Sequence, residues 1–577
     1  MIYSCKNLIK GSNYAEEFFV SRGIEDKDNF INPTKNNLLD PFLLDNMAEG
    51  VSLLINHLQN NSKILIIIDS DEDGFTSSAM LWLYLKEVFG DIDLEYAIHE
   101  GKQHGLEDII EDIERNPKYQ LIIQPDAGSN DEEYHKRLRD LNIDCLVLDH
   151  HHADGYSKYA IVINNQLSSN YPNKALSGGG VVYKFLQALD ETMNANCADD
   201  YLDLAAVALI GDMMELNTLE NRYIVNQGLK NIKNNCLQEL INRQSFSIKD
   251  TDNITPADIS FYITPLVNAI VRVGRPSEKR VMFEAFLDGK KMVPKISRNK
   301  IVEGQFESLG EQNARNSVNA RSRQNRAIEK AIEQVKFSIM KNGLDQNKII
   351  LAEIKDSNID STLTGLLAMK LTGIYNRPVL LGRLDDYQTT IKGSIRGMNN
   401  SVLKDLRQFL LNSNYFDYCE GHPNAAGFGI AKDKVEDFIN YSNSELADVD
   451  FGEGLYLVDI EVNGEESKRL EDIIFSLGGF GNIWGKGIEE PLIAIEDLRL
   501  TDKNYSVCGA KNNTLRIQKD GVTYIQFNAE KIIQELEGKK DFSMTIVGTP
   551  NINNWMGQEN AQVIIKDCEI RNTIFDF

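Results

Sequence analysis

The chain has 577 residues, which at about 150 residues per domain predicts roughly four domains, each large enough for its own core. Its 42% apolar and 25% charged residues are ordinary for a globular protein, and no apolar run approaches the roughly 18 residues that span a bilayer. Since the start MIYSCKNLIKGSNY also lacks the apolar centre of a signal peptide, we expect a cytoplasmic protein that does not associate with membranes.

The charge and the cysteines narrow the possible ligands. The seven cysteines are scattered without a CxxC pair, so neither a disulfide framework nor a thiolate zinc site is predicted. A formal net charge of −25 argues against nonspecific binding to nucleic acid, because such binders usually display a basic face. Residues 315–341, with seven Lys/Arg against two Glu, show that a local basic strip can coexist with an acidic whole.

Residues 62–240 alternate between strand and helix patterns, and the four clearest strands are predicted at 63–69, 94–99, 120–126 and 143–150. Such alternation is typical of a parallel sheet, in which ligands bind beyond the carboxyl ends of the strands. We therefore expect the chemistry where three of these strands end, at Asp69 to Asp73, at Asp126 and at Asp149 to His152.

The second half of the chain changes pattern twice. Ile328, Ile332, Val335 and Ile339 lie at helical spacing on a polar background, which predicts a long amphipathic helix that ends near Gly343 and joins two lobes. A second α/β lobe follows, and beyond about residue 450 short alternating strands predict a small barrel. The predicted segments are 1–55, packing on the first α/β domain, then the α/β domain 56–310, the connecting helix 311–345, the second α/β domain 346–450 and the C-terminal β-barrel 451–577.

The first acidic cluster, DSDEDG, places Asp69, Asp71 and Asp73 at alternate positions, so that an extended chain would point them to one side. Gly74 permits a close turn into the next helix. The alternative to a catalytic cluster is a calcium-binding loop, but the Glu that is usual at the twelfth position of such a loop is replaced here by Met80.

The second cluster is Asp149, His150, His151 and His152, which uses three of the eight histidines directly after an apolar strand. Asp and imidazole side chains there can ligate a divalent ion, and this mixture favours Mn²⁺ or Mg²⁺ over a zinc site; the alternative is a solvated turn. Asp212 follows a further apolar segment and is a possible contributor, although an Asp after a helix is more often a cap.

Together these motifs and their spacing resemble the DHH phosphoesterase superfamily and, within it, the RecJ family of single-stranded-DNA-specific exonucleases, whose further motifs ALSGGGVVYKFL, PLVNAIVR, GSIRG and GHPNAAGFGI stand in the expected order. The resemblance implies a DHH domain, a DHH-associated domain and an OB-like barrel. It also implies a centre for two Mn²⁺ or Mg²⁺ ions, which would activate water for attack on a phosphodiester. The implied ligands are Asp71, Asp73, Asp126, His150 and Asp212, with Asp126 bridging, His151 near the scissile phosphate, and Asp69 and Asp149 in support.

The resemblance assigns substrate contacts as well. His422 would face the scissile phosphate, and Ser394, Arg396, Asn268 and Arg272 would bind the substrate, the serine and the arginines at its terminal 5′ phosphate, where guanidinium forks suit a dianion. For arbitrary arginines, surface ion pairs are the commoner outcome. The chain departs from the family pattern at Ser70, Glu72 and Glu420, none of which is an implied ligand.

The leading hypothesis is a metal-dependent 5′ to 3′ exonuclease that degrades single-stranded DNA to nucleoside monophosphates in recombination or repair, as a monomer that works beside a helicase or single-strand-binding protein. One alternative keeps the chemistry but acts on short RNA or cyclic dinucleotides. Another is a noncatalytic replication scaffold, which the complete set of implied ligands disfavours.

Overall fold

The computed structural model describes the chain except for residues 6–8, 10–12, 100, 102, 249, 298–299, 357–358, 399–400, 452–453, 482, 510, 556–557 and 573–577. The chain divides into two compact units. The parallel-sheet unit comprises Asp26–Gln324 and Asn482–Glu489, and the composite unit comprises Met1–Glu25, Asn325–Gly481 and Glu490–Phe577.

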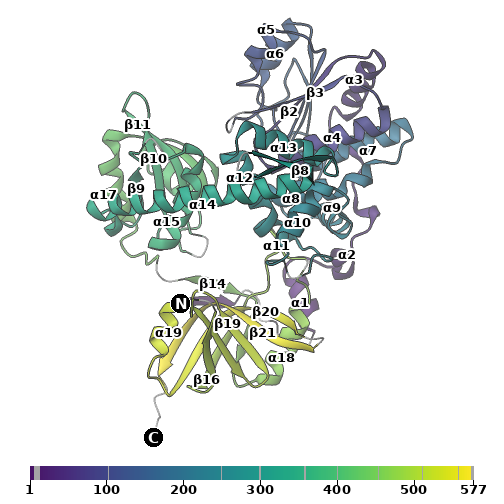
Figure 1. The fold of residues 1–577 in the computed structure, drawn as a ribbon. Helices are drawn as coiled ribbons and strands as arrows, with labels where there is room; N and C mark the ends of the chain where they lie inside the picture. The colour runs from purple at the N-terminus through teal and green to yellow at the C-terminus, as the bar shows by residue number, and fades with distance from the viewer. Residues whose placement is uncertain are drawn as a thin grey trace. The chain divides into compact units, whose positions relative to one another are not determined.

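The parallel-sheet unit is built on five parallel strands in the order β3-β2-β4-β5-β6. Figure 1 labels β2 and β3 of this sheet. The sequence ILIII of β2 is buried throughout, as expected for a central strand rich in β-branched residues and covered on both faces. The four predicted strands are present, and a fifth, β6, was not predicted. Their bounds are β2 Ile64–Ile68, β3 Leu94–Ile98, β4 Leu121–Pro125, β5 Asp144–Asp149 and β6 Ile161–Asn164.

Helices cover both faces of this sheet. On one face Leu65 and Ile67 pack with Ile110 of α5 and Leu138 of α6. On the other face α3 approaches so closely that a Cβ on Gly50 would lie 2.7 Å from the Ile163 side chain. The helices up to this point in the fold are α2 Lys27–Ile31, α3 Met47–Gln59, α4 Glu72–Phe89, α5 Ile110–Arg115, α6 Glu132–Asp140 and α7 Gly178–Met193.

A helical layer and one hairpin complete the parallel-sheet unit. The hairpin pairs β7 (Met292–Ser297) with β8 (Lys300–Ser308), antiparallel and separate from the main sheet. The helices are α8 Leu202–Gly211, α9 Leu219–Lys230, α10 Asn235–Arg243, α11 Pro256–Asp258, α12 Thr264–Val273 and α13 Pro276–Leu287.

The predicted connecting helix is α14, which spans Leu309–Lys341 and passes from one unit to the other after Gln324. The four residues whose spacing predicted it, from Ile328 to Ile339, are all buried. Gly343 follows with a φ of 63°, a left-handed conformation that suits glycine and ends the helix as predicted.

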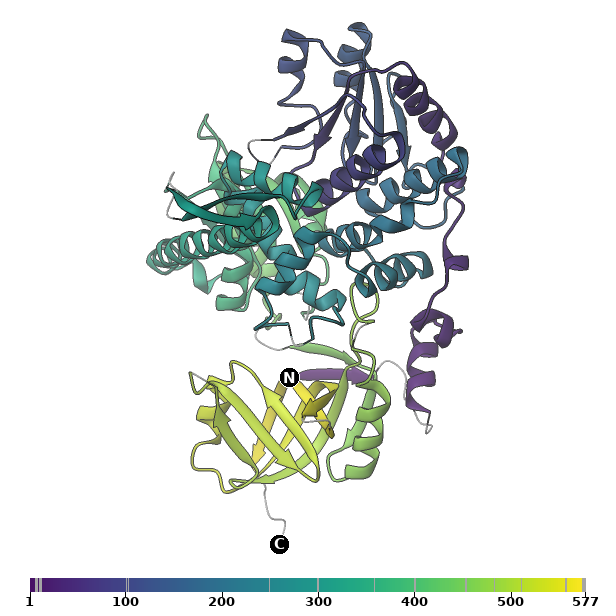
Figure 2. The same ribbon diagram turned by 45° about the vertical axis from the view of Figure 1, so that its right-hand side comes forward.

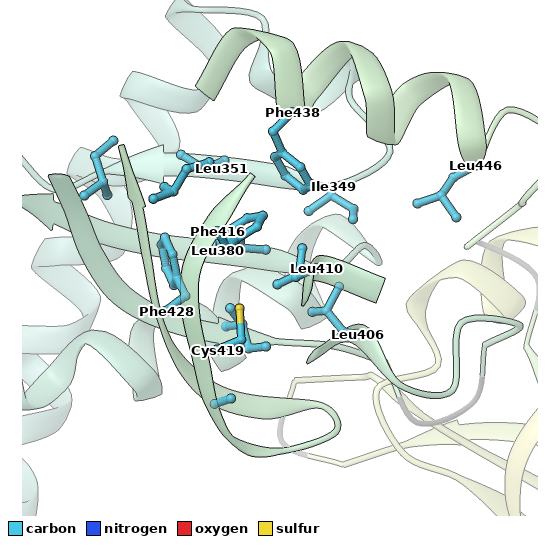
Figure 3. Close-up of a cluster of buried hydrophobic side chains, with 14 of the residues drawn as sticks. Ile349, Leu351, Leu380, Leu406, Leu410, Phe416, Cys419, Phe428, Phe438 and Leu446 are labelled. Atoms are coloured by element: carbon cyan, nitrogen blue, oxygen red, sulfur yellow. The ribbon is translucent and has the colours of Figure 1, made fainter. Parts of the chain in front are cut away.

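The second α/β lobe is a mixed five-stranded sheet in the order β12-β13-β11-β10-β9. Its core brings together Phe416, Phe428 and Phe438, and Figure 3 shows these rings beside Leu351 and Leu380. The elements are β9 Ile350–Glu353, α15 Thr364–Tyr375, β10 Val379–Leu384, β11 Thr390–Arg396, α16 Leu406–Asn412, β12 Phe416–His422, β13 Ala425–Ala431 and α17 Val435–Glu445.

The C-terminal region forms a seven-stranded sheet in the order β15-β16-β20-β21-β19-β18-β17, and Figure 2 shows helix α18 beside it. Within the described residues its outer strands do not pair with each other, so the sheet is not closed. The elements are β15 Ile460–Asn463, α18 Ser467–Leu477, β16 Ile493–Thr501, β17 Tyr505–Cys508, β18 Thr514–Lys519, β19 Val522–Gln526, α19 Glu530–Leu536, β20 Asp541–Trp555 and β21 Gln558–Asn572.

The start of the chain belongs with these C-terminal elements. Strand β1 (Ile2–Cys5) pairs in parallel with β14 (Leu455–Val458). After helix α1 (Tyr14–Ser21), the guanidinium of Arg22 binds both oxygens of the buried Asp459 at 2.9 and 3.0 Å. The predicted α/β plan is confirmed, whereas the exact domain boundaries, including a single segment 1–55, stay predictions. No helix in the described part of the chain combines the length and apolarity needed to cross a bilayer.

Candidate metal centre

The first acidic cluster lies at the turn between β2 and α4. Asp69 directly follows the strand, and Asp71 caps the helix by accepting a hydrogen bond from the Gly74 N–H at 3.0 Å. A Cβ on Gly74 would lie 2.6 Å from the Asp69 Cβ and 2.7 Å from its carbonyl oxygen, so only glycine fits this turn. The sequence predicted that Asp69, Asp71 and Asp73 would lie on one side of an extended chain. Helix α4 instead begins at Glu72, so Asp73 reaches the cluster from the first turn of the helix.

Asp73 is held by the amino end of α7. Its carboxylate accepts hydrogen bonds from the N–H groups of Gly178 at 2.8 Å and Gly179 at 2.7 Å, where the helix end carries partial positive charge. Burial and the nearby Asp71 nevertheless raise the pKa of Asp73 to about 7, against the effect of these hydrogen bonds. A glycine at position 178 lets the start of α7 come this close to the site, because a Cβ on Gly178 would lie 2.4 Å from the Cβ of Asp126.

Asp126 and His150 form the buried middle of the site. Asp126 follows β4 with a φ of 63°, and neither of its carboxylate oxygens has a hydrogen-bond partner among the described residues. His150 Nε2 also lacks a hydrogen-bond partner there and lies 3.3 Å from Asp126 Oδ1 and 3.4 Å from Asp212 Oδ2. Burial, followed by repulsion from Asp73 and other carboxylates, raises the pKa of Asp126 well above its ordinary value.

Asp149 and His151 form a neighbouring pair on the loop after β5. Asp149 is buried and accepts hydrogen bonds from the Ser129 N–H at 2.9 Å and from His151 Nδ1 at 2.8 Å. Although burial acts in the opposite direction, the hydrogen bond and charge of His151 hold the pKa of Asp149 below its ordinary value. The His151 side chain is 51% exposed, so its ring is fixed at one nitrogen and open to solvent on the other side.

The assembled side chains fit a divalent cation. Three overlapping sets have their ligand atoms within 4.8 Å of one another, and Asp126 and His150 each belong to two of these sets. Buried carboxylates that repel one another and an imidazole nitrogen with no hydrogen-bond partner are satisfied by a cation, and this donor set suits Mn²⁺ or Mg²⁺. The sets are Asp126, His150 and His151; Asp73, His150 and Asp212; and Asp69, Asp71 and Asp126.

The structure thus brings together the seven predicted metal-site residues and His151, while the role of each one remains a prediction. Sequence reasoning missed His104, whose Nδ1 lies 2.7 Å from Asp69 Oδ2, and it missed the amide groups that hold Asp73. Two sequence features could have indicated these contacts: the glycine-flanked turn GKQHGL, which contains His104, and the run SGGG at the start of α7.

The predicted substrate-binding residues divide between the two units. Asn268 and Arg272 lie half-buried on α12 of the parallel-sheet unit, and burial lowers the pKa of Arg272 while the charge of Asp71 acts in the opposite direction. Ser394, Arg396 and His422 belong to the composite unit. A Cβ on Gly365 would lie 2.7 Å from the Arg396 guanidinium and 3.6 Å from Ser394 Oγ, so these two side chains lie close together; His422 is the exposed last residue of β12.

Comparisons with known proteins agree with this arrangement. A model of the DHH family N-terminal domain matches residues 63–209, and a model of the RecJ OB domain matches residues 472–567. The chain is 36% identical, over 96% of its length and 95% of the relative, to a Bacillus subtilis protein named as an SPbeta prophage-derived single-strand DNA-specific exonuclease, YorK. It is 26% identical to the B. subtilis single-stranded-DNA-specific exonuclease RecJ, over 96% of this chain and 67% of that one.

The fold is also that of a solved structure. RecJ from Thermus thermophilus in complex with Mn²⁺ superposes with a TM-score of 0.73 at 19% identity, covering 98% of this chain and 79% of that one. The same protein in complex with Mg²⁺ gives a TM-score of 0.67.

Proposed function

Because the chain belongs to the RecJ family of single-stranded-DNA-specific exonucleases, we propose that it hydrolyses single-stranded DNA from one end at the metal centre described above. The observation that carries this proposal is the buried pair Asp126 and His150, whose ligand atoms lie 3.3 Å apart without hydrogen-bond partners in the described structure. A scaffold that binds no metal would have little reason to bury them unsatisfied.

The centre would hold two Mn²⁺ or Mg²⁺ ions. Asp126 and His150, which each belong to two of the three ligand sets, would be the central ligands that hold the ions. When bound, such ions lower the pKa of the attacking water and stabilise charge on the phosphate. Asp71, Asp73 and Asp212 would be the remaining ligands, and Asp69, held by His104, would support them.

Several side chains of the protein would act on the substrate directly. His151, fixed at Nδ1 by Asp149, would donate a hydrogen bond from Nε2 to a nonbridging oxygen of the scissile phosphate. His422 would contact the same phosphate. Arg272, Asn268, Ser394 and Arg396 would bind the terminal 5′ phosphate and the nucleotide next to it, which would make the enzyme a 5′ to 3′ exonuclease.

The product would be a nucleoside 5′-monophosphate. Water attacks the scissile phosphorus and the bond to the 3′ oxygen of the terminal nucleotide breaks. The released nucleotide then carries a 3′ hydroxyl and its own 5′ phosphate, while the scissile phosphate stays on the 5′ oxygen of the shortened strand. We place this activity in DNA recombination or repair in the cytoplasm. The protein would act as a monomer beside a helicase or a single-strand-binding protein, which would supply unpaired strands.

Asp126→Asn tests the proposal. Asparagine tolerates the positive φ at this position and keeps the shape of the side chain, so the change removes charge without a steric penalty. We expect hydrolysis of a 5′-labelled single-stranded 20-mer with Mn²⁺ to fall at least about 100-fold, since even loss of an outer-shell partner of a metal ligand costs 10- to 100-fold.

The matched control is Asp154→Asn, an exposed carboxylate on the loop after β5, which should keep wild-type activity. Parallel reactions with a 3′-labelled strand report polarity, because a 5′ to 3′ enzyme releases the 5′ label as a mononucleotide from the start. Wild-type hydrolysis by Asp126→Asn would show that the metal centre is assigned to the wrong residues.

A further inference from the structure

A second feature of the parallel-sheet unit is a groove whose lining contains none of the residues of the acidic cluster. The groove has a volume of about 550 Å³ and lies between the start of α13, the hairpin strand β7 and the first half of α14. Its lining carries four cationic side chains, one carboxylate, three amides, one hydroxyl and two apolar side chains. These residues are Arg275, Ser277, Glu278, Val281, Lys295, Ile296, Gln312, Arg315, Asn316, Asn319 and Arg323.

The groove is the centre of a basic stretch in an acidic protein. Residues 272–326 hold 13 Lys/Arg and 6 Asp/Glu, a net of 13 − 6 = +7, whereas the whole chain has −25. The walls alone carry four cations against Glu278, a net of 4 − 1 = +3. Such a local reversal of sign is the electrostatic footprint of a site for a polyanion.

Two of the guanidinium groups are held in place. Arg315 forms a paired contact with both oxygens of the buried Glu307 on β8, and Arg323 Nη2 lies 2.7 Å from Glu278 Oε2. An arginine has five N–H donors in a planar fork, so a contact with one carboxylate leaves donors for a second anion. The ion pairs therefore hold the two guanidinium groups in position to bind oxygen anions, although the paired glutamates reduce the positive charge of the groove.

The groove begins close to the substrate side of the metal centre. Arg275, at the start of α13, is three residues after Arg272, and three residues span at most about 11 Å. Arg272 in turn lies near enough to Asp71 for the two charges to interact. With its terminal 5′ phosphate at Arg272 and the next phosphodiester at the metal centre, a strand would meet the groove within a few nucleotides on the 3′ side of the cleaved bond.

We propose that this groove binds the sugar-phosphate backbone of the single-stranded DNA substrate a few nucleotides from the end that is hydrolysed. The inference rests on the proposed function. The forks and amides match phosphate oxygens, while Val281 and Ile296 offer apolar surface for the face of a base. A volume within the roughly 300 to 1,000 Å³ of small-ligand sites takes one or two unpaired nucleotides and not a duplex.

Variants on the groove wall test this site. Lys295→Glu combined with Asn319→Asp reverses one charge and adds another, and both side chains reach solvent. The matched control is Lys300→Glu, an exposed lysine of the same hairpin that does not line the groove. The substrates are a 5′-phosphorylated thymidine dinucleotide, too short to reach the groove from the metal centre, and a thymidine 20-mer.

For the double variant we expect KM for the 20-mer to rise about tenfold or more, with kcat unchanged and dinucleotide hydrolysis within twofold of wild type. The slope of log KM against log salt should fall by about one for each phosphate that the variant no longer neutralises. Lys300→Glu should match the wild type in both respects. If the double variant is unfolded by circular dichroism, Lys295→Gln replaces it, because a long neutral side chain preserves the packing of the wall.

The outcomes separate the two proposals. If the wild type hydrolyses neither substrate, the proposed function fails, and the groove inference falls with it. If it hydrolyses both and the double variant behaves like Lys300→Glu, the groove inference is overturned while the proposed function stands. If the double variant binds the 20-mer normally but loses binding of an oligoglutamate peptide, the groove serves an acidic protein and the inference is likewise overturned.

Discussion

The metal centre and the basic groove both lie in the parallel-sheet unit, but they differ in whether their charged side chains already have partners of opposite charge. At the metal centre Asp69, Asp73 and Asp126 are each 1% exposed, and the oxygens of Asp126 have no partner in the described structure. In the groove, Arg315 and Arg323 are already paired with glutamates. The centre therefore depends on added cations to be satisfied, whereas the groove is satisfied without its ligand and would bind reversibly. We therefore expect that a mutation can impair either region without impairing the other.

Among changes outside the proposed ligands, the largest effect should come from Gly74→Ala, which disrupts the turn of the first acidic cluster. The added Cβ would collide with backbone and Cβ atoms of Asp69, which cannot rotate away, so Asp69 and Asp71 must move. A displacement of about 1 Å can cost about 100-fold in rate, and we expect that loss in Mn²⁺-dependent hydrolysis. Binding of the 20-mer without metal, measured by fluorescence anisotropy, should stay within twofold because the groove is untouched.

The control is Gly373→Ala on α15, where an added Cβ has no neighbour within 4 Å. That variant should keep full activity and gain about 0.5 to 1 kcal/mol of stability, since alanine favours a helix over glycine. Full activity in Gly74→Ala would mean that the close turn does not hold the carboxylates in place.

A smaller effect is expected from His104→Ala, which removes the partner of Asp69 at 2.7 Å and leaves every proposed ligand in place. Outer-shell partners of this kind change metal affinity by about 10- to 100-fold. Isothermal titration with Mn²⁺ should show that loss, with partial recovery in His104→Gln, which retains a hydrogen-bond donor. His152→Ala, an exposed neighbour of the second cluster, is the control, and equal Mn²⁺ affinity in the two alanine variants would contradict the role of His104.

The smallest effect concerns stability. Without metal, Asp126→Asn should melt about 2 to 4 °C above the wild type, because asparagine avoids the burial and repulsion that disfavour the ionised Asp126 carboxylate. Saturating Mn²⁺ should reverse the order, since ligand at 100 times its Kd stabilises the wild type by about 2.7 kcal/mol and the variant by less. Differential scanning calorimetry with EDTA and then with Mn²⁺ measures both, and identical melting in EDTA would show that Asp126 is not strained without a cation.

The sequence was sufficient to predict which strand ends come together. Parallel strands present their carboxyl ends at one edge, so polar residues after 63–69, 120–126 and 143–150 had to meet. Asp212 follows a helix rather than a strand, and the family resemblance was needed to place it with the others.

The rest depends on contacts that no local pattern encodes. His104 reaches Asp69 from a turn 35 residues away, and the amides that hold Asp73 come from more than 100 residues away. The basic strip was visible in the sequence from residue 315, but the groove needs the hairpin strand β7, which lies inside a segment predicted only as part of a larger domain. The C-terminal strands were predicted as a barrel, yet closure is decided by pairing between the outer strands.

The pairing of β1 with β14 has a consequence for how the protein is made. Ile2 is opposite Leu455, so the first strand to leave the ribosome has no partner until more than 450 further residues have been synthesised. At about 5 to 20 residues per second this delay is roughly 20 to 90 s. During that interval the larger segment of the parallel-sheet unit, Asp26–Gln324, can fold, while its segment Asn482–Glu489 and the last segment of the composite unit are added only near the end of translation.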